Sequence, residues 1–303
     1  MQQSAMGRLL RGTLGQGQVR VLMCDTTAMA DLCSKTHAAS SVCAAALGRG
    51  ISAAALLTAA QDDPETNLTM TVKGGGPAGA LVVAAHGRRL KAYVDNPQVT
   101  LPHKENGKLD VGGALGKDGL LTVVRDLKMR EPYVGQCQLQ SGEIGEDVAY
   151  YCVMSEQQPT LCAVGVLVSE GNVVSSGGVL IQPLPGCDEK ILQALEVRTM
   201  LFSDISAQLL AMPMEDFFSA SFRDLDPQML EVEALSYACD CSRERMEKVL
   251  LSLGPQELSE MIDQDGGAEI VCNFCRTRHN FSKEELQSLL VRAQEVQAQH
   301  KAD

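Results

Sequence analysis

This sequence contains no tryptophan and no stretch rich in basic residues. None of the 303 residues is tryptophan, aromatic residues make up 4%, and no phenylalanine precedes Phe202. Lysine and arginine number 26 against 38 aspartates and glutamates, which gives a formal net charge of −12. Because contacts to phosphates supply most of the affinity of nucleic-acid-binding proteins, an acidic chain without a basic stripe is a poor nucleic-acid binder. We therefore expect no nucleic-acid partner.

Segments that lead a chain to or across a membrane are also lacking. The apolar run from Ala53 to Ala60 is shorter than the roughly 20 residues that a bilayer requires, and it indicates a buried helix instead. The first ten residues have no signal-peptide core. We expect a cytoplasmic protein with no membrane partner. In that reducing compartment its 11 cysteines should be thiols or metal ligands rather than a disulfide framework.

Catalytic motifs are scarce. The sequence shows no Ser-His-Asp, HExxH or nucleophile-elbow arrangement. Before residue 183 the histidines are His37, His86 and His103, so general acid–base catalysis has few candidate groups. The glycines at 74–76 lack the GxxxxGK[ST] pattern of a phosphate-binding loop and are explained by hairpin turns. These absences favour a binding protein over an enzyme.

Four cysteines near the C-terminal end stand in two close pairs. Cys239 and Cys241 form a CxC pair, and after 30 intervening residues Cys272 and Cys275 form a CxxC pair. Each pair can offer two sulfurs from a short turn, and the residues between can fold back to bring the pairs together. Four thiolates at tetrahedral corners are the closed site that zinc prefers. We therefore predict one Zn²⁺ bound by all four cysteines; most sites of this kind only hold a small domain together.

The same sulfurs allow a second chemistry, because thiolates rather than thiols react with oxidants. A sulfenic acid on one cysteine can be resolved into a disulfide by a neighbour two or three positions away. We hypothesise that oxidation pairs Cys239 with Cys241 and Cys272 with Cys275, and that zinc is then released. The small ring of a CxC disulfide is strained, which should keep that bond reducible. This behaviour suits a redox switch.

Around these cysteines the sequence resembles the thirty-three-kilodalton chaperonins, which are cytosolic heat-shock holdases activated by oxidation. The specific matches are YACDCSRER at 237–245, LLSLG at 250–254 and CNFC at 272–275. Weaker matches keep the same order: RG at 11–12, AALGR at 45–49, GGGP at 74–77 and LGKDG at 115–119. The resemblance covers nearly the whole chain. It implies a chaperone that binds unfolded client proteins without ATP and forms a homodimer when oxidised.

Two other functions remain open at this point. A thiol–disulfide oxidoreductase could use Cys272 and Cys275, but it would usually place the CxxC pair in a thioredoxin-like βαβ unit, which the sequence lacks. A zinc-ribbon nucleic-acid binder would fit the four cysteines, but the acidic charge argues against it. Turnover of a disulfide substrate would identify the first, and a salt-dependent gel shift the second.

The residue pattern predicts an α+β protein in three parts. Residues 1–183 should form an N-terminal α/β sandwich-like domain with hairpin-rich sheets, 184–235 a helical acidic linker, and 236–303 a small zinc-binding redox-switch module. In the first part we expect helix over 28–61. Gly48 and Gly50 either end one helix there or are tolerated because two helices pack closely at that point. We expect a loop over 112–119, and a strand or a helix over 147–154.

The linker should be an amphipathic helix over 189–210 followed by a Met/Phe-rich stretch. It contains three basic and ten acidic residues between Asp188 and Glu233, and it holds four of the six phenylalanines, namely Phe202, Phe217, Phe218 and Phe222. Its apolar face should dock on the first domain. The chaperone hypothesis adds that oxidation releases this face.

The module should begin helices after Ser242, at Pro255 and at the capping box Ser282–Glu285. Its core is thin. Structural zinc contributes about 10–16 kcal/mol to the folding of small zinc peptides, whereas a core of this size leaves about 3–5 kcal/mol. Loss of zinc should therefore unfold the module. Of the seven other cysteines, Cys24, Cys33 and Cys43 are expected to be small buried side chains, and oxidation of Cys187 beside the linker is left open.

Overall fold

The computed structural model describes residues 5–61, 63, 65–126 and 131–300. These residues divide into two compact units, Met1–Ala238 and Cys239–Asp303. Both helices and strands occur in each unit, so the predicted α+β class is confirmed.

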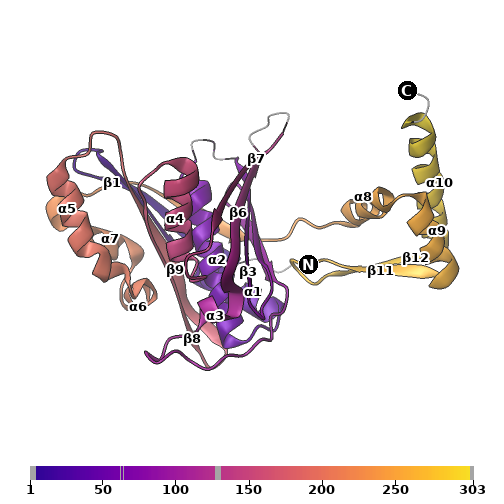
Figure 1. Ribbon diagram of the computed structural model, residues 1–303, viewed down its shortest axis with the longest axis horizontal. Coiled ribbons are helices and arrows are strands. Elements are labelled where there is room, and N and C mark those ends of the chain that lie inside the picture. The colour runs from indigo at the N-terminus through magenta and orange to yellow at the C-terminus, as the bar shows by residue number, and fades with distance from the viewer. Residues whose placement is uncertain (1–4, 62, 64, 127–130, 301–303) are drawn as a thin grey trace. The chain divides into compact units, whose positions relative to one another are not determined.

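One mixed sheet is the frame of the first unit (Figure 1), and within the described ranges it has ten strands in the order β7-β6-β3-β4-β5-β10-β1-β2-β9-β8. Neighbouring strands pair antiparallel except β5 and β10, which are parallel. The strands are β1 (Ala5–Leu14), β2 (Val19–Asp25), β3 (Asn67–Gly75), β4 (Leu81–His86), β5 (Arg89–Val94), β6 (Gly116–Asp126), β7 (Tyr133–Gln138), β8 (Leu161–Ser169), β9 (Asn172–Pro183) and β10 (Gln228–Tyr237). Most consecutive strands form hairpins, as the sequence predicted.

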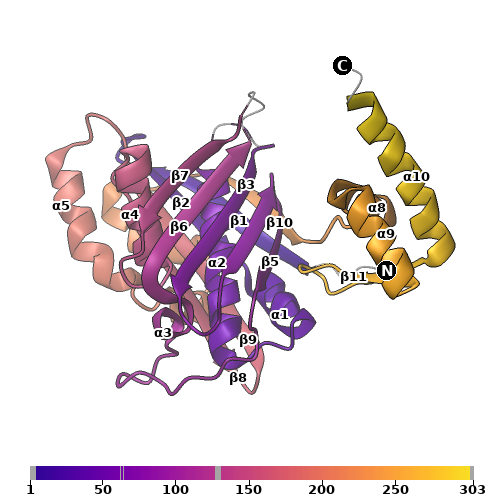
Figure 2. The same cartoon turned by 45° about the vertical axis from the view of Figure 1, so that its right-hand side comes forward.

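Helix α2 (Ser41–Ala59) lies between the two halves of this sheet (Figure 2). It contacts β3, β4 and β5 on one side and β2, β8 and β9 on the other. Helix α1 (Thr27–Thr36) packs beside it. The helical stretch predicted over 28–61 is therefore two helices, and the break falls at 37–40 rather than at the glycines.

Gly48 and Gly50 lie inside α2 at its contacts with the strands. A Cβ at Gly48 would come within 2.7 Å of Val166 Cγ2, and one at Gly50 within 2.9 Å of Leu81 Cδ2. Of the two explanations given for these glycines, close packing holds, but the partners are mainly strands.

By length and composition α2 is able to cross a membrane, with a mean hydropathy of 1.6 over 18 residues. The expectation that no stretch is apolar enough was therefore wrong, because it considered only Ala53 to Ala60. Inside the protein 94% of that window is buried. Such burial is typical of the core helix of a soluble protein.

A second group of helices covers the other face of β1, β2 and β9. It consists of α5 (Glu189–Arg198), the 3₁₀ helix η1 (Thr199–Phe202), α6 (Ile205–Ala211), α7 (Met214–Ser221) and the 3₁₀ helix η2 (Arg223–Leu225). Side chains alternate along β1, so that Leu9 faces α2 and Leu10 faces these helices. The single helix predicted over 189–210 is wrong: Phe202 and Ile205 turn into the sheet, while Leu201, counted on the apolar face, is 48% exposed.

Two further expectations about the first unit are corrected or decided. The loop predicted over 112–119 is the short helix α3 (Val111–Leu115) followed directly by β6. Asp110 Oδ1 accepts a hydrogen bond from Gly113 N at 2.9 Å and caps that helix. The segment left as strand or helix is the helix α4 (Gly145–Glu156).

The second unit contains α8 (Arg243–Leu253), α9 (Pro255–Gln264), the hairpin of β11 (Gly267–Val271) and β12 (Arg278–Ser282), and α10 (Lys283–His300). Its predicted helix starts are confirmed: Ser242 Oγ accepts from Arg245 N, and Ser282 and Glu285 form the reciprocal capping box. The buried core among its described residues is Met246, Leu250, Leu258, Ile262, Phe281, Leu286, Leu289 and Ala293. Eight side chains make a small core for independent stability.

Candidate metal centre

The four predicted cysteines come together in the second unit. Cys239 and Cys241 directly precede α8, and Cys272 and Cys275 lie in the turn between β11 and β12. All four Sγ atoms lie within 4.8 Å of one another. Cys239 Sγ is 3.7 Å from Cys272 Sγ, and Cys241 Sγ is 3.3 Å from Cys275 Sγ.

This arrangement fits a zinc ion. Tetrahedral zinc with four Zn–S bonds of about 2.3 Å holds its sulfurs about 3.8 Å apart, close to the two distances above. Cys239 and Cys272 are buried, whereas Cys241 and Cys275 are half-buried. Two of the sulfurs are thus shielded from water and two are accessible to small oxidants.

Backbone hydrogen bonds shape the turn that carries the second pair. Arg276 N donates to Cys272 O at 2.8 Å, and Cys272 N donates to Thr277 O at 3.0 Å. Arg276 adopts a left-handed conformation with φ 58°. The turn closes on itself so that both sulfurs of the pair face the same point.

The sulfurs perturb one another strongly. A hydrogen bond from the Cys239 thiol lowers the pKa of Cys272 to about 4, helped by N–H groups of the turn, and the same contact raises the pKa of Cys239. Burial, followed by the contact with Cys275, raises the pKa of Cys241 to about 12. Without a cation Cys239 and Cys272 therefore share a proton instead of both being ionised. A dication supplies the positive charge that four thiolates require.

One polar side chain at the centre was not predicted. His279 of β12 places Nε2 3.7 Å from Cys241 Sγ. The signal in the sequence was the spacing Cys272-x₂-Cys275-x₃-His279, which resembles the spacing of zinc ligands on one hairpin.

The surroundings of the CxxC pair differ from those of an oxidoreductase. Reactive CxxC cysteines lie at helix N-termini, where the helix dipole favours the thiolate. Here Cys272 and Cys275 lie between two antiparallel strands. The arrangement therefore gives no support to the oxidoreductase alternative.

Phenylalanines of the predicted linker form a second feature, in the first unit. Phe202, Phe217, Phe218 and Phe222 are buried against β1, β2 and β9. The ring centroids of Phe202 and Phe222 are 5.8 Å apart, and those of Phe218 and Phe222 are 5.6 Å apart. Each ring contributes about 1.5–3 kcal/mol by leaving water, so this aromatic cluster (Phe202, Phe217, Phe218 and Phe222) is the main apolar anchor of the segment.

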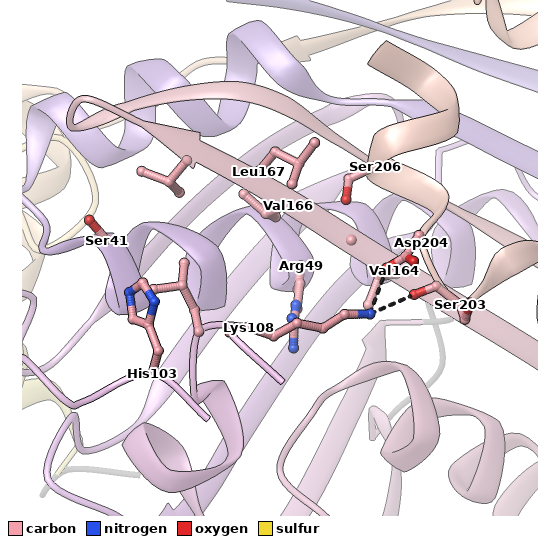
Figure 3. Close-up of a pocket in the computed structure, with 14 residues that line it drawn as sticks. Ser41, Arg49, His103, Lys108, Val164, Val166, Leu167, Ser203, Asp204 and Ser206 are labelled. Carbon is pink, nitrogen blue, oxygen red and sulfur yellow. Dashed lines mark hydrogen bonds and ion pairs between the residues drawn. The ribbon is translucent and has the colours of Figure 1, made fainter. Parts of the chain in front are cut away.

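Ion pairs at the rim fasten the same segment. Lys108 Nζ lies 2.6 Å from Asp204 Oδ1 and 3.4 Å from Ser203 O, across a pocket of about 280 Å³ that Arg49 and His103 also line (Figure 3). Exposed pairs of this kind contribute about 0–1 kcal/mol each. Such pairs help to orient the helical segment but add little to its stability.

Strand β10 is fastened by a more buried cluster of three charged side chains. Glu233 Oε2 accepts from Arg11 Nε at 3.0 Å and from Arg88 Nε at 3.0 Å. The three groups connect β10 to β1 and to the β4–β5 turn. Their side chains are 19–24% exposed, so water screens this cluster less than the rim pairs.

Cysteines of the first unit lie apart from this chemistry. Cys24, Cys33 and Cys43 are buried, as expected. Burial raises the pKa values of Cys24 and Cys33 to about 12. Cys187 is half-buried, and no described contact joins it to another thiol.

The fold and the site define a protein with a β-sheet domain, a helical apolar cover and a separate small unit built around four thiols. The family model described as Hsp33 protein matches residues 7–282, and the chain belongs to that family. It is 39% identical over 286 residues to the 33 kDa chaperonin of Alkaliphilus metalliredigens, covering 93% of this chain and 98% of the relative. It is 39% identical over 290 residues to that of Clostridium acetobutylicum, covering 94% and 97%.

A solved structure agrees with this assignment. The crystal structure of the 33 kDa chaperonin (heat shock protein 33 homolog) from Thermotoga maritima superposes with a TM-score of 0.86 at 34% identity. The match covers 95% of this chain and 99% of that one. The predicted family resemblance is therefore confirmed, and the chain is a member of a chaperone family.

Proposed function

We propose that the protein is a redox-regulated, ATP-independent holdase that binds unfolding proteins under oxidative stress. The observation that carries this proposal is the meeting of four cysteine sulfurs within 4.8 Å, in a unit with only eight buried core side chains among its described residues. Family membership supports the chaperone part. The redox part rests on the chemistry of the sulfurs.

In the reduced protein Cys239, Cys241, Cys272 and Cys275 bind one Zn²⁺. The bound ion contributes about 10–16 kcal/mol of folding free energy in small zinc domains. The residues of the chain contribute the geometry: the turn at 272–277 and the N-terminus of α8 present the sulfurs from two sides. The second unit is folded in this state.

Oxidation removes the ligands. Two molecules of hydrogen peroxide take up four electrons and four protons and become four waters, while the four thiolates become the disulfides Cys239–Cys241 and Cys272–Cys275. Disulfide sulfurs no longer hold the dication, which is freed. Because the remaining core is too small, the second unit then unfolds.

Unfolding leaves β10 less well anchored. That strand ends at Tyr237, two residues before Cys239, and its pairing with β5 is confined to Ser236 and Tyr237. When the following chain becomes disordered, β10 and the helices α5–α7 before it loosen. The aromatic cluster and the exposed Met200 then offer an adaptable apolar surface to unfolded clients.

The remaining parts of the proposal concern partners and place. The active, oxidised form is a homodimer, the protein works in the cytoplasm, and it acts by binding rather than by catalysis. Neither a nucleic acid nor a membrane is a partner. The net charge of −12 supports the first exclusion.

The direct test is to add peroxide under mild heat and to follow zinc release together with suppression of client aggregation. Both should rise together, with one zinc freed per two peroxides consumed. The variant with all four cysteines replaced by serine should show no peroxide response, whereas Cys187→Ser should respond like the wild type. Peroxide-dependent protection that survives in the fourfold variant would contradict the proposal.

A further inference from the structure

His279 provides a fifth donor beside the four cysteines. Its Nε2 lies 3.7 Å from Cys241 Sγ, next to the position that this sulfur occupies, while the donors that all lie within 4.8 Å of one another are the four sulfurs. The neutral imidazole is the commonest metal ligand in proteins. The nitrogen therefore stands beside one specific sulfur of the site, that of Cys241.

The register of strand β12 determines on which side of the hairpin the His279 ring lies. Along β12 exposure alternates: Arg278 and Asn280 are exposed, His279 is half-buried, and Phe281 is buried in the core of the unit. His279 is opposite Ile270 of β11. Because alternate residues of a strand share a face, His279 faces inward with Phe281.

The spacing along the chain agrees with the geometry. Cys272, Cys275 and His279 are three donors on one hairpin, separated by two and three residues. Zinc accepts three cysteines and one histidine as readily as four cysteines. We propose that His279 is a reserve zinc ligand, which takes the coordination position of Cys241 when that sulfur is unavailable.

With such a reserve ligand, the loss of different sulfurs would weaken metal binding to different extents. Loss of Cys241 would leave three thiolates and an imidazole, still four donors, with a site charge of about −1 instead of −2. Loss of Cys239 removes a buried corner whose sulfur contacts that of Cys272, whereas the contact of His279 is with Cys241. Release of the metal then requires more than the loss of the accessible Cys241.

The inference rests on the proposed zinc binding, and the test separates the two. Co²⁺ and Zn²⁺ affinities are measured by chelator competition on the reduced full chain for the wild type, Cys241→Ala, Cys241→Ala with His279→Phe, Cys239→Ala, and Cys239→Ala with His279→Phe. Phenylalanine keeps a ring at position 279 but removes its nitrogens. The Cys239 pair is the matched control.

We expect Cys241→Ala to bind metal at least about tenfold more tightly than its His279→Phe partner. Its Co²⁺ form should show about three quarters of the sulfur-to-cobalt charge-transfer absorption of the wild type, since three thiolates remain. The Cys239→Ala variants should have equal affinities with and without His279.

Equal affinities in the Cys241 pair would overturn the inference, as would a Cys241→Ala chain that binds no metal or stays unfolded in excess Co²⁺. An equal loss in the Cys239 pair would assign His279 a structural role only and would also overturn it. If the wild type itself binds no metal, the proposed function fails too. If only the variants disagree, the proposed function stands.

Discussion

Gly12 of β1 and the ring of Phe218 of α7 are in direct contact. A Cβ on Gly12 would come within 2.6 Å of Phe218 Cζ and 3.0 Å of Gln228 O. Because Gly12 has no side chain, the aromatic cluster can pack directly against the sheet.

Gly12→Ala should therefore loosen the helical cover without oxidation. Overpacking of this kind costs about 1–3 kcal/mol. We expect the reduced variant to bind a hydrophobic dye and to suppress client aggregation partly before any peroxide is added. Ser219→Ala, on the exposed side of α7, is the control and should behave like the wild type. A Gly12→Ala protein that stays inactive until oxidised, with normal hydrogen exchange in α7, would argue against release of this cover as the activating event.

The anchor of β10 should be sensitive to pH. Although burial raises it, hydrogen bonds from Arg88 and Arg11 bring the pKa of Glu233 below its usual range. A carboxylate with a lowered pKa stabilises the fold above its unfolded pKa of about 4.3 and loses that contribution as pH falls through its folded pKa. Glu233→Gln should therefore cost about 2 kcal/mol at pH 7 and little in acid below the folded pKa.

Urea unfolding of the first unit at several pH values measures this difference. Glu231→Gln, an exposed glutamate on the same strand, is the control and should change stability by less than about 0.5 kcal/mol at any pH. A Glu233→Gln deficit that does not shrink in acid would show that the carboxylate charge is not what fastens β10.

Arg276 carries backbone strain within the metal turn. Its φ of 58° lies in the left-handed region, which costs a residue with a side chain about 1–2 kcal/mol relative to glycine. Arg276→Gly should therefore stabilise the second unit and slow zinc loss to a chelator, while Arg276→Val should speed it. Arg278→Gly, in the extended strand β12, should weaken the unit by about 0.5–1 kcal/mol. Faster zinc loss from Arg276→Gly than from the wild type would refute this view of the turn.

Thiol reactivity should separate the metal centre from the other cysteines. Burial raises the pKa of Cys24, Cys33 and Cys152 to about 12, and desolvation also raises that of the partly accessible Cys162. Burial and then the charge of Asp188 also raise the pKa of Cys187, but this thiol is only half-buried. An aromatic disulfide reagent should therefore react first with about one thiol, Cys187, in the reduced zinc form and with about five after zinc is chelated. Cys187→Ser should lower both counts by one. Equal counts with and without chelator would show that no metal protects the four cysteines.

The sequence revealed most where structure depends on local chemistry. The caps at Ser242 and Ser282 satisfy amides three residues away, so their signals lie within one turn of helix. The meeting of Cys239, Cys241, Cys272 and Cys275 followed from the preference of zinc for paired thiolates, and their role as ligands is still a prediction.

What the sequence hid depends on distant partners. Strand β10 was placed in a helical linker, because its residues Met229, Leu230 and Val232 are exposed and it is defined only by pairing with β1 and β5. The break in the predicted linker helix likewise depends on where Phe202 meets the sheet. The approach of His279 to Cys241 joins a strand of the β11–β12 hairpin to the segment before α8, 38 positions away in the sequence.

Hydrogen exchange on one sample of reduced protein, with free zinc measured beside it during peroxide addition, tests the central claim most directly. We predict that amides of residues 239–300 lose protection in step with zinc release, and that α5–α7 and β10 follow. Full protection of the second unit after all zinc has been released, or a reduced protein that contains no zinc, would contradict the account.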